Sequence, residues 1–295
     1  MTEYIGLIGA GAMGGAIGAR LATTGTNLKV FDLDPIKVAA LVDKGAVAAS
    51  STAELGRNAR AVIVSLNSAA IVRAAIFGKN GLADEAEKGL LVIDMSSIDP
   101  MATRDLAAEA EAHGLRWVDS PLSGGAPKAE IGQLTLMQGG TEADVLEAQG
   151  ILAQVASNQT HMGPIGAGQT TKIINQVLCG LGFMAVAEAT ALAEAAGVNV
   201  SRIPSALKGG RADSALLQEY MPRFAGRDYR RTGRIDNMVK DLDGARELAR
   251  QTQISMPLTA LAAEVHRMLT DAGLGGEDQA ALMEFFSGPN KEKFL

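Results

Sequence analysis

Three glycines near the start of the chain have the spacing that binds a dinucleotide. Gly9, Gly11 and Gly14 form the pattern G-x-G-x-x-G after a strand-like run and at the start of a helical run. The first glycine would permit the tight turn, the second would let the backbone approach a pyrophosphate, and the third would let the helix pack against the strand. Ala12 and Met13 complete the first helical turn, whose N–H groups attract an anion. A glycine turn alone is also typical of an ordinary strand–turn–helix connection.

An acidic residue at the end of the next strand-like run strengthens this interpretation. Asp32 follows residues 28–31 at the expected distance, about 20 residues after the glycines. A carboxylate there accepts hydrogen bonds from the ribose hydroxyls of NAD and repels the 2′-phosphate of NADP. Residues 33–35 add no arginine that could receive such a phosphate. The pattern therefore predicts NAD(H) as the preferred cofactor, with NADP(H) possible if cations on other loops compensate.

Two later strand-like runs end in small polar residues. Leu66 and Asn67 end one run, and Ser97 follows another. Because ligands of open parallel sheets bind at the carboxyl ends of strands, these residues are candidates for contact with the cofactor. Asn67 and Ser97 are equally typical of helix N-caps.

A glycine-rich segment is the first candidate for binding a substrate. Ser123, Gly124 and Gly125 follow a strand-like run and would expose consecutive backbone N–H groups. Such a group of donors binds a carboxylate without needing a charged side chain. A simple glycine turn has the same sequence, so the segment alone does not decide between the two.

A lysine in an apolar helical run is the second candidate. Lys172 and Asn175 lie three residues apart and therefore share a face of the helix. A lysine whose head reaches solvent along its own stem explains this pattern without any function. Alternatively, Lys172 faces a cleft as a general acid/base, with a pKa lowered by partial desolvation, and Asn175 holds a substrate hydroxyl or carboxylate. Lys240, beside Asp241 on a later helical run, is typical of a solvated helix face.

These residues need a scaffold that brings strand ends together. The first half of the chain alternates almost wholly apolar strand-like runs with Ala-rich helical runs, which is typical of a parallel sheet covered on both faces. We therefore predict the fold class α/β, with an N-terminal Rossmann domain over 1–164, a doubly wound parallel sheet that binds NAD(P). An all-α C-terminal domain over 165–295 follows, opening with a long interdomain helix and serving the substrate and oligomerisation. The expected strands are 4–8, 28–31, 61–66, 90–95 and 116–118, with 134–138 and 157–161 at the far edge, and the expected helices are 12–22, 35–44, 102–113, 168–196, 202–208, 216–224, 237–251 and 257–272.

Composition limits the partners. A net charge of −6 without a block of Lys or Arg disfavours binding to nucleic acid or to an anionic membrane surface. Cys179 is the single cysteine, and the three histidines lie far apart, which indicates neither a disulfide nor a metal site. No basic leader precedes the first strand-like run, and no uncharged apolar run reaches about 18 residues, so we expect a cytoplasmic protein. The long apolar helix at 168–196 predicts a homodimer or homotetramer, because one chain could hardly cover it.

The order of these motifs resembles the β-hydroxyacid dehydrogenase family, which includes the 3-hydroxyisobutyrate dehydrogenases and, more distantly, the 6-phosphogluconate dehydrogenases. The resemblance covers essentially the whole chain, and five motifs in one order are far more specific than any one of them alone. They are the glycine turn with Met13, the segments 94–97 and 119–125, residues 166–169 with Lys172 and Asn175, and residues 240–242.

The resemblance implies an oxidoreductase that interconverts a small 3-hydroxy acid and its 3-oxo acid (a semialdehyde) with NAD(H). Imine reductases of similar sequence replace the helical lysine, so its retention favours alcohol/carbonyl chemistry. The implied roles are Lys172 as catalytic acid/base, Ser123, Gly124, Gly125 and Asn175 as substrate-binding residues, and Asn67, Ser97 and Lys240 as residues at the cofactor.

The exact substrate stays open at this point. Within the family, residues 123–129 and 271–279 are most similar to the tartronate semialdehyde reductases. However, residues 278–282 replace an expected Asp-His-Ser-Ala-Leu, and residues 209–214 carry an unexpected Arg211 and Asp213. The alternatives are 3-hydroxyisobutyrate, L-threonate or a sulfonate analogue as substrate. A non-catalytic NAD(H)-binding sensor is an alternative of another class.

Overall fold

A sheet of nine strands organises the first half of the chain in the computed structural model, which describes residues 3–286. Six strands run parallel in the order β3–β2–β1–β4–β5–β6, so the strand order reverses between β1 and β4. This order is that of a Rossmann fold, whose ligands bind at the carboxyl ends of the strands beside the reversal. The strands are β1 (Tyr4–Ile8), β2 (Leu28–Phe31), β3 (Val47–Ala48), β4 (Ala59–Val64), β5 (Leu91–Asp94), β6 (Arg116–Asp119), β7 (Leu122–Ser123), β8 (Leu134–Gly139) and β9 (Ala156–Gly163).

The far edge of this sheet is mixed rather than parallel. β8 pairs antiparallel with β6 and with β7, and β9 pairs parallel with β8. The two predicted edge strands are therefore present, and their pairing makes the otherwise parallel sheet mixed at this edge. β3 and β7 have only two residues each and give no alternating pattern that a sequence could show.

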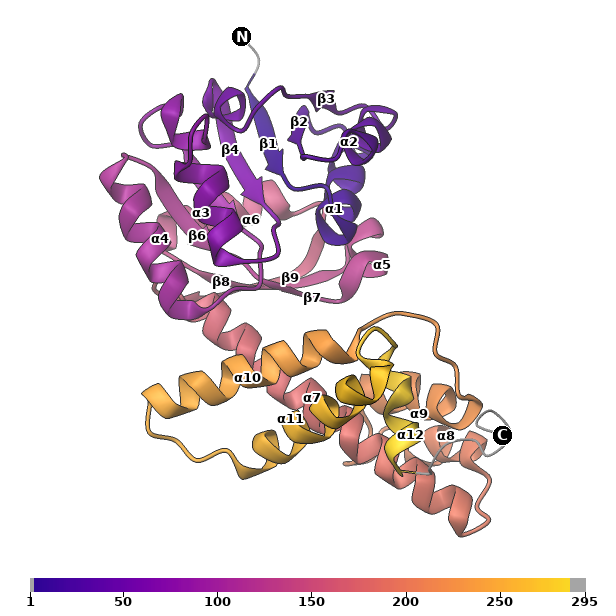
Figure 1. Cartoon of the computed structure of the whole chain (residues 1–295). Coiled ribbons are helices and arrows are strands. Elements are labelled where there is room, and N and C mark those ends of the chain that lie inside the picture. Colours follow the sequence, from indigo (N-terminus) through magenta and orange to yellow (C-terminus); the bar gives the residue numbers. More distant parts are fainter. Residues whose placement is uncertain (1–2, 287–295) are drawn as a thin grey trace. The chain divides into compact units, whose positions relative to one another are not determined.

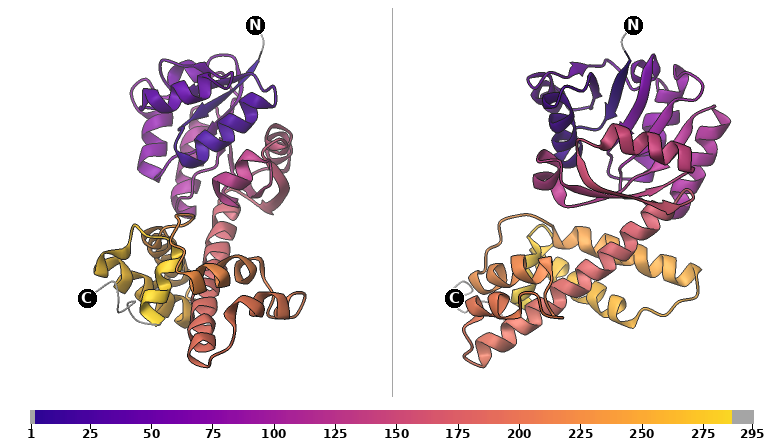
Figure 2. Two further views of the ribbon diagram at one scale, coloured as in Figure 1. Left: turned by 90° about the vertical axis from the view of Figure 1, so that its right-hand side faces the viewer. Right: turned by 180° about the vertical axis from the view of Figure 1, so that it is seen from behind.

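The sheet is covered on both faces, as Figures 1 and 2 show. Alternate side chains of each strand enter two separate cores: Ile5 and Leu7 pack with α1, α2, α5 and α6, whereas Tyr4 and Ile8 pack with α3 and α4. The prediction of a doubly wound α/β fold is confirmed. The helices are α1 (Ala12–Thr23), α2 (Pro35–Val42), α3 (Ala69–Phe77), α4 (Pro100–Ala112), α5 (Gly125–Glu130) and α6 (Glu142–Leu152), with the short 3₁₀ turns η1 (Ala53–Gly56) and η2 (Leu82–Asp84).

Local signals explain where several helices begin. Asp34 accepts a hydrogen bond from the Ile36 N–H, and Pro35 occupies the first turn of α2. Asp99 and Pro100 begin α4 in the same way. These starts fix the loops after β2 and β5 at the carboxyl edge of the sheet.

The second half of the chain is helical. It contains α7 (Ala167–Ala195), α8 (Ile203–Leu207), α9 (Ala215–Gly226), α10 (Ile235–Gln251), α11 (Pro257–Leu269) and α12 (Met283–Phe286), with short turns η3 (Val200–Arg202), η4 (Thr270–Leu274) and η5 (Gln279–Leu282). The chain divides within α7 into two compact units, Met1–Lys172 and Ile173–Leu295. The second unit has its own core, in which Phe224 and Leu242 are fully buried. The prediction of an all-α second half is confirmed.

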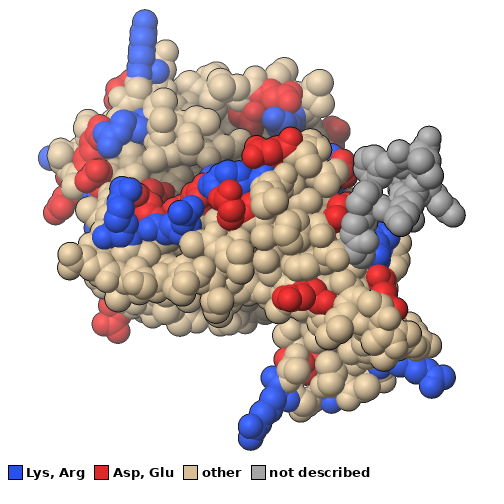
Figure 3. All heavy atoms as spheres, turned by 60° about the horizontal axis from the view of Figure 1, so that its bottom comes forward, with Lys and Arg blue, Asp and Glu red and all other residues tan. Residues whose placement is uncertain are grey.

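The helical unit carries charges of both signs on its surface. Arg267 on α11 forms ion pairs with Asp243 on α10 (2.7 Å) and with Glu264 (3.1 Å). On the face drawn in Figure 3, blue and red side chains alternate in bands between broad uncharged areas. By length and composition alone, α7 is apolar enough to cross a membrane, although one such helix also occurs in the cores of soluble proteins.

Candidate functional site

The glycine turn has the geometry that its sequence predicts. Gly9 has a φ of +94°, and a Cβ there would lie 2.3 Å from the Ser65 carbonyl oxygen. A Cβ on Gly14 would lie 2.0 Å from the Gly9 carbonyl oxygen, so α1 can approach β1 only because this residue is glycine. Gly11 differs, since a Cβ there would meet no atom within 4 Å. The space in front of Gly11 is therefore open to a ligand.

The start of α1 suits a phosphate. Gly11 is the N-cap residue and provides no side-chain cap, and the first turn carries no acidic side chain. The N–H groups of Ala12 and Met13 lie in this turn, where helix N–H groups lack intrahelical partners. An anionic pyrophosphate would supply the missing acceptors and would interact favourably with the helix dipole.

The Asp32 carboxylate is held in place by backbone groups. Its Oδ2 accepts a hydrogen bond from the Ala10 N–H (2.6 Å), and its Oδ1 accepts one from the Asp34 N–H (2.8 Å). The first contact ties Asp32 to the glycine turn. Each carboxylate oxygen keeps a further lone pair, which a ribose hydroxyl could use.

A hollow of about 450 Å³ adjoins Asp32. Its walls are the ends of β1 and β2, the loop after β3, and one side of α3. Leu66, Ile71 and Ala74 contribute apolar surface that suits a flat aromatic ring, and Asp32 contributes a polar group. Residues that sequence reasoning missed complete the lining: Ser50, Ser51, Thr52, Ala75, Lys79 and Asn80. The glycine turn, the helix start and this hollow together fit an adenine dinucleotide.

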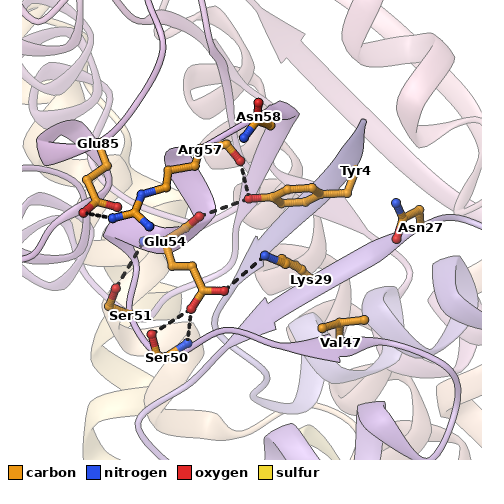
Figure 4. Close-up of a pocket in the computed structure, with 10 residues that line it drawn as sticks. All are labelled: Tyr4, Asn27, Lys29, Val47, Ser50, Ser51, Glu54, Arg57, Asn58 and Glu85. Carbon is orange, nitrogen blue, oxygen red and sulfur yellow. Dashed lines mark hydrogen bonds and ion pairs between the residues drawn. The ribbon is translucent and has the colours of Figure 1, made fainter. Parts of the chain in front are cut away.

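A larger hollow of about 670 Å³ lies around the start of β1 and β2 (Figure 4). Its charged residues are paired with each other: Lys29 lies 3.1 Å from Glu54, and Arg57 pairs with Glu85. The Tyr4 hydroxyl donates to main-chain carbonyl oxygens, the shortest contact being 2.7 Å to Arg57. Since these groups satisfy one another, we assign no chemistry to this hollow despite its size.

Ser96 joins the ends of β4 and β5 beside the hollow that adjoins Asp32. Its hydroxyl accepts a hydrogen bond from the Leu66 N–H (3.0 Å), so it links the end of β5 to the end of β4. Ser96 is buried, whereas of the two predicted cofactor ligands nearby Ser97 is half-buried and Asn67 is exposed. Asn67 is not the N-cap of α3, because Ser68 takes that position. Asn67 and Ser97 stay predictions as cofactor ligands.

The segment Ser123–Gly125 forms the corner between β7 and α5. Gly124 has a φ of +123° and Gly125 a φ of +70°, which are conformations that glycine adopts readily. Gly124 is exposed, and Ser123 and Gly125 are half-buried. The accessible backbone of this corner is consistent with the predicted anion site.

Two buried carboxyl groups lie side by side behind this edge. Asp94 on β5 and Asp119 on β6 are partners in register, and both are fully buried. Burial raises the pKa of Asp94 to about 7, hydrogen bonds from Ser96 oppose this, and the Asp119 charge adds to it. Burial also raises the pKa of Asp119, against hydrogen bonds from the N–H groups of Gly166 and Gln169.

Lys172 belongs to the same unit as the glycine turn, on the second turn of α7. It is half-buried. Asn175 and Lys240 belong to the helical unit. There the Asn175 amide donates to Gln176 (2.9 Å), and the Lys240 ammonium lies 3.4 Å from Asp241. In the structure, most of the predicted residues therefore lie in the first unit, at the carboxyl ends of its strands. Two of them, Asn175 and Lys240, lie in the second unit.

The unexpected residues of the helical unit have structural partners. Asp213 accepts hydrogen bonds from the Gly209 N–H (2.7 Å) and the Gln218 amide (2.6 Å), which closes the loop before α9. Gln279 contacts His266 (2.9 Å) in the interior. Asp278 is fully buried; it accepts hydrogen bonds from the backbone N–H groups of Thr232, Gly233 and Ala280 and pairs with Arg223. Arg211 is exposed. Neither Asp213 nor the 278–279 pair therefore provides evidence about the substrate.

Metal ligands do not gather in the part of the chain that the structure describes, since no group of three or more His, Cys, Asp or Glu suited to an ion occurs in residues 3–286. Cys179 is half-buried and contacts the Asn175 amide at 3.7 Å.

Two glycine substitutions should separate ligand contact from packing. Gly11→Ala fits the protein, so we expect its melting temperature to stay within about 2 °C of the wild type while its Kd for NADH rises about tenfold or more. Gly14→Ala should lower the melting temperature and weaken NADH binding, because its Cβ collides with the Gly9 carbonyl. Thermal melts and fluorescence titration measure both. Unchanged NADH affinity in Gly11→Ala would show that this residue does not face the pyrophosphate.

Comparisons with known proteins agree with this geometry. Residues 4–163 match the family model of the NAD-binding domain of 6-phosphogluconate dehydrogenase, and residues 166–286 match that of the NAD-binding region of NADP-dependent 3-hydroxyisobutyrate dehydrogenase. L-threonate dehydrogenase of Cupriavidus necator is 34% identical over 98% of this chain and 97% of its own length. For 2-hydroxy-3-oxopropionate reductase of Escherichia coli the identity is 31%, over 95% of this chain and 96% of that protein.

A solved structure gives the same answer. The crystal structure of 3-hydroxyisobutyrate dehydrogenase from Salmonella typhimurium has a TM-score of 0.85 and 32% identity, covering 97% of this chain and 100% of that one. The family predicted from the order of the motifs is confirmed by both family models and by these relatives. The chain therefore belongs to the β-hydroxyacid dehydrogenase family of NAD(P)-dependent oxidoreductases.

Proposed function

We propose that this protein is an NAD(H)-preferring reductase of a small 3-oxo acid, with tartronate semialdehyde as the first substrate to test and Lys172 as general acid/base. The observation that carries the proposal is the placement of Lys172 in the same unit as the glycine turn and the Asp32 hollow. A dinucleotide site and a proton donor on one sheet edge are the two parts that carbonyl reduction requires.

The first unit would hold the cofactor. Gly11, Ala12 and Met13 would receive the pyrophosphate, and Asp32 would accept hydrogen bonds from the ribose hydroxyls. When bound, the nicotinamide supplies a hydride to the carbonyl carbon or takes one back. A 2′-phosphate would meet the fixed Asp32 carboxylate, which supports NAD(H) over NADP(H), while Lys79 in the same lining offers a cation that leaves NADP(H) possible.

The substrate would be anchored and protonated by groups of this chain. The backbone of Ser123–Gly125 would bind the carboxylate, which fixes the carbonyl without a charged side chain. Asn175, one helical turn beyond Lys172, would hold the substrate hydroxyl. The Lys172 ammonium would donate a proton to the carbonyl oxygen as negative charge develops there, and its amine would take the proton back in the oxidative direction.

The relatives support a class of substrate rather than one compound. Their names include a threonate dehydrogenase and a 2-hydroxy-3-oxopropionate reductase, at similar identity to this chain. Both names describe short, polar hydroxy or oxo acids. An exposed glycine corner that binds a carboxylate suits any acid of this class. The preference for one acid must therefore come from the residues that contact the rest of the substrate.

A substrate panel tests the proposal. We expect the protein to oxidise NADH in the presence of tartronate semialdehyde. We expect a lower rate of NAD reduction with L-threonate, 3-hydroxyisobutyrate or 3-carbon sulfonate analogues. NADPH should support turnover less well than NADH. Tight NADH binding without turnover of any panel member would contradict the enzymatic assignment and favour a sensor.

We also propose a homodimer or homotetramer, in the cytoplasm, with residues 165–295 providing the contacts between copies. Ile174, Leu178 and Leu192 lie along one stripe of α7 and expose 54%, 68% and 70% of their surfaces. Large apolar side chains exposed along one face of a helix are typical of interfaces. Light scattering should give at least twice the chain mass of 30.5 kDa, and Leu178→Glu should reduce it. A wild-type mass of one chain would contradict the proposal.

A further inference from the structure

The start of α7 is bonded to the strand ends by two buried side chains. The Asp119 carboxylate, at the end of β6, accepts hydrogen bonds from the Gly166 N–H (2.7 Å) and the Gln169 N–H (2.9 Å). Because the first N–H groups of a helix have no intrahelical partners, Asp119 caps α7 from a strand 47 residues earlier. Its negative charge also interacts favourably with the positive end of the helix dipole.

Gln169 makes the second connection. Its amide nitrogen donates to the Ser96 carbonyl oxygen (2.7 Å), and its amide oxygen accepts from the Ile98 N–H (3.3 Å). Only 1% of Gln169 is exposed. The Ser96 hydroxyl accepts a hydrogen bond from the Leu66 N–H, and Leu66 lines the hollow that adjoins Asp32. Hydrogen bonds through Ser96 therefore connect α7 to the wall of this hollow.

The start of α7 packs closely against the ends of β6 and β8. A Cβ on Gly168 would lie 2.7 Å from Asp119 Oδ2 and 2.4 Å from the Met137 carbonyl oxygen. A Cβ on Gly139 would lie 2.5 Å from Asp119 Oδ1. The Asp119 carboxylate is therefore surrounded by backbone on both sides, and the first turn of α7 sits directly against it.

Lys172 lies three residues after Gln169, and residues three apart are neighbours on a helix surface. The side chain of Gln169 points to the end of β5, so Lys172 follows one turn further along the same face of α7. We propose that Asp119 and Gln169 are positioning residues that act through Lys172: they fix the first turn of α7 against β5 and β6, and thereby place the Lys172 amine relative to the cofactor edge. This inference rests on the proposed role of Lys172 in the reaction.

A double-mutant cycle tests it. Asp119→Asn hardly changes the volume of the side chain, but it replaces one of the two carboxylate oxygens with an amide NH₂ group. This group is a donor and cannot accept the hydrogen bond of the backbone N–H that faces it. We expect kcat to fall about tenfold or more, the Kd for NADH to change less than about threefold, and the pH dependence of kcat to shift as the amine moves. In a Lys172→Ala background the same substitution should change kcat less than about twofold, because its effect needs the lysine.

Controls keep the outcomes distinct. Asp144→Asn removes another buried aspartate of the same unit, which pairs with Arg116 (2.7 Å) at the start of α6, and should cost stability without lowering kcat. If Asp119→Asn does not fold, Gln169→Met carries the same cycle. Equal losses of kcat from Asp119→Asn with and without Lys172, or no loss with Lys172 present, would overturn the inference. A Lys172→Ala enzyme with wild-type kcat would instead refute the proposed function.

Discussion

Replacing Lys172 with alanine is expected to lower kcat about a hundredfold or more and to leave the Kd for NADH nearly unchanged. The reason is chemical: charge develops on the carbonyl oxygen during hydride transfer, and without the ammonium only water can protonate it. Lys172 belongs to the unit that carries the glycine turn, and its side chain is half-buried rather than freely solvated. Steady-state kinetics and fluorescence titration of NADH measure the two quantities.

Two variants control this experiment. Lys172→Arg keeps the positive charge but cannot release a proton near neutral pH, so an acid/base role predicts a large loss of kcat in this variant as well. Lys44→Ala removes an exposed lysine after α2, in the same unit, and should leave kcat unchanged. Full activity in Lys172→Arg would show that the residue contributes charge alone, and full activity in Lys172→Ala would remove it from the mechanism.

Replacing Asp94 with asparagine is expected to change how stability depends on pH. Asp94 is fully buried, its Oδ1 accepts from the Ser96 N–H (3.0 Å), and its Oδ2 has no hydrogen-bond partner among the described residues. Burial raises its pKa from 3.8 to about 7. At a pH between these two values, the folded protein keeps this carboxyl group protonated, whereas the unfolded chain has it ionised. Asparagine keeps the acceptor for Ser96 and cannot ionise.

The sign follows from linkage. A raised folded pKa stabilises the protein below the unfolded pKa of 3.8, and this stability is lost as pH rises through about 7. Between pH 5 and pH 8 the wild type should therefore lose on the order of 3 kcal/mol that Asp94→Asn does not lose. Urea unfolding of both proteins at the two pH values measures the difference. The same difference in unfolding free energy at pH 5 and pH 8 would show that Asp94 does not titrate in this range.

Short-range signals made much of the fold and of the cofactor site predictable. The turn at Gly9 and Gly14 depends on neighbouring residues alone, and the structure places Asp32 beside it through the Ala10 N–H. Five of the six parallel strands followed from apolar runs between turn residues, whereas the two-residue β3 was not predicted. The helix α3 was not predicted, although Ser68 caps it, and with it the lining residues Lys79 and Asn80 were missed.

Long-range contacts explain what the sequence did not reveal. Asp119 stands in a motif that was recognised, yet its bonds go to Gly166 and Gln169, which lie 47 and 50 residues later. Ser96 and Ser97 are adjacent serines, and only the structure shows that Ser96 faces inward. The departures at Asp213 and Gln279 looked like substrate determinants in the sequence, but both side chains bond within the helical unit. The assignments of Lys172, Asn175 and Lys240 stay predictions.

Transfer of deuterium tests the central claim most directly. The wild-type protein would be incubated with the best oxo-acid substrate of the panel and NADH that carries deuterium in both positions at C4 of the nicotinamide, and the product would be analysed by NMR. We expect deuterium at the former carbonyl carbon, in proportion to the NADH oxidised. Bound NADH that is not oxidised by any of these acids, or product without deuterium at that carbon, would contradict it.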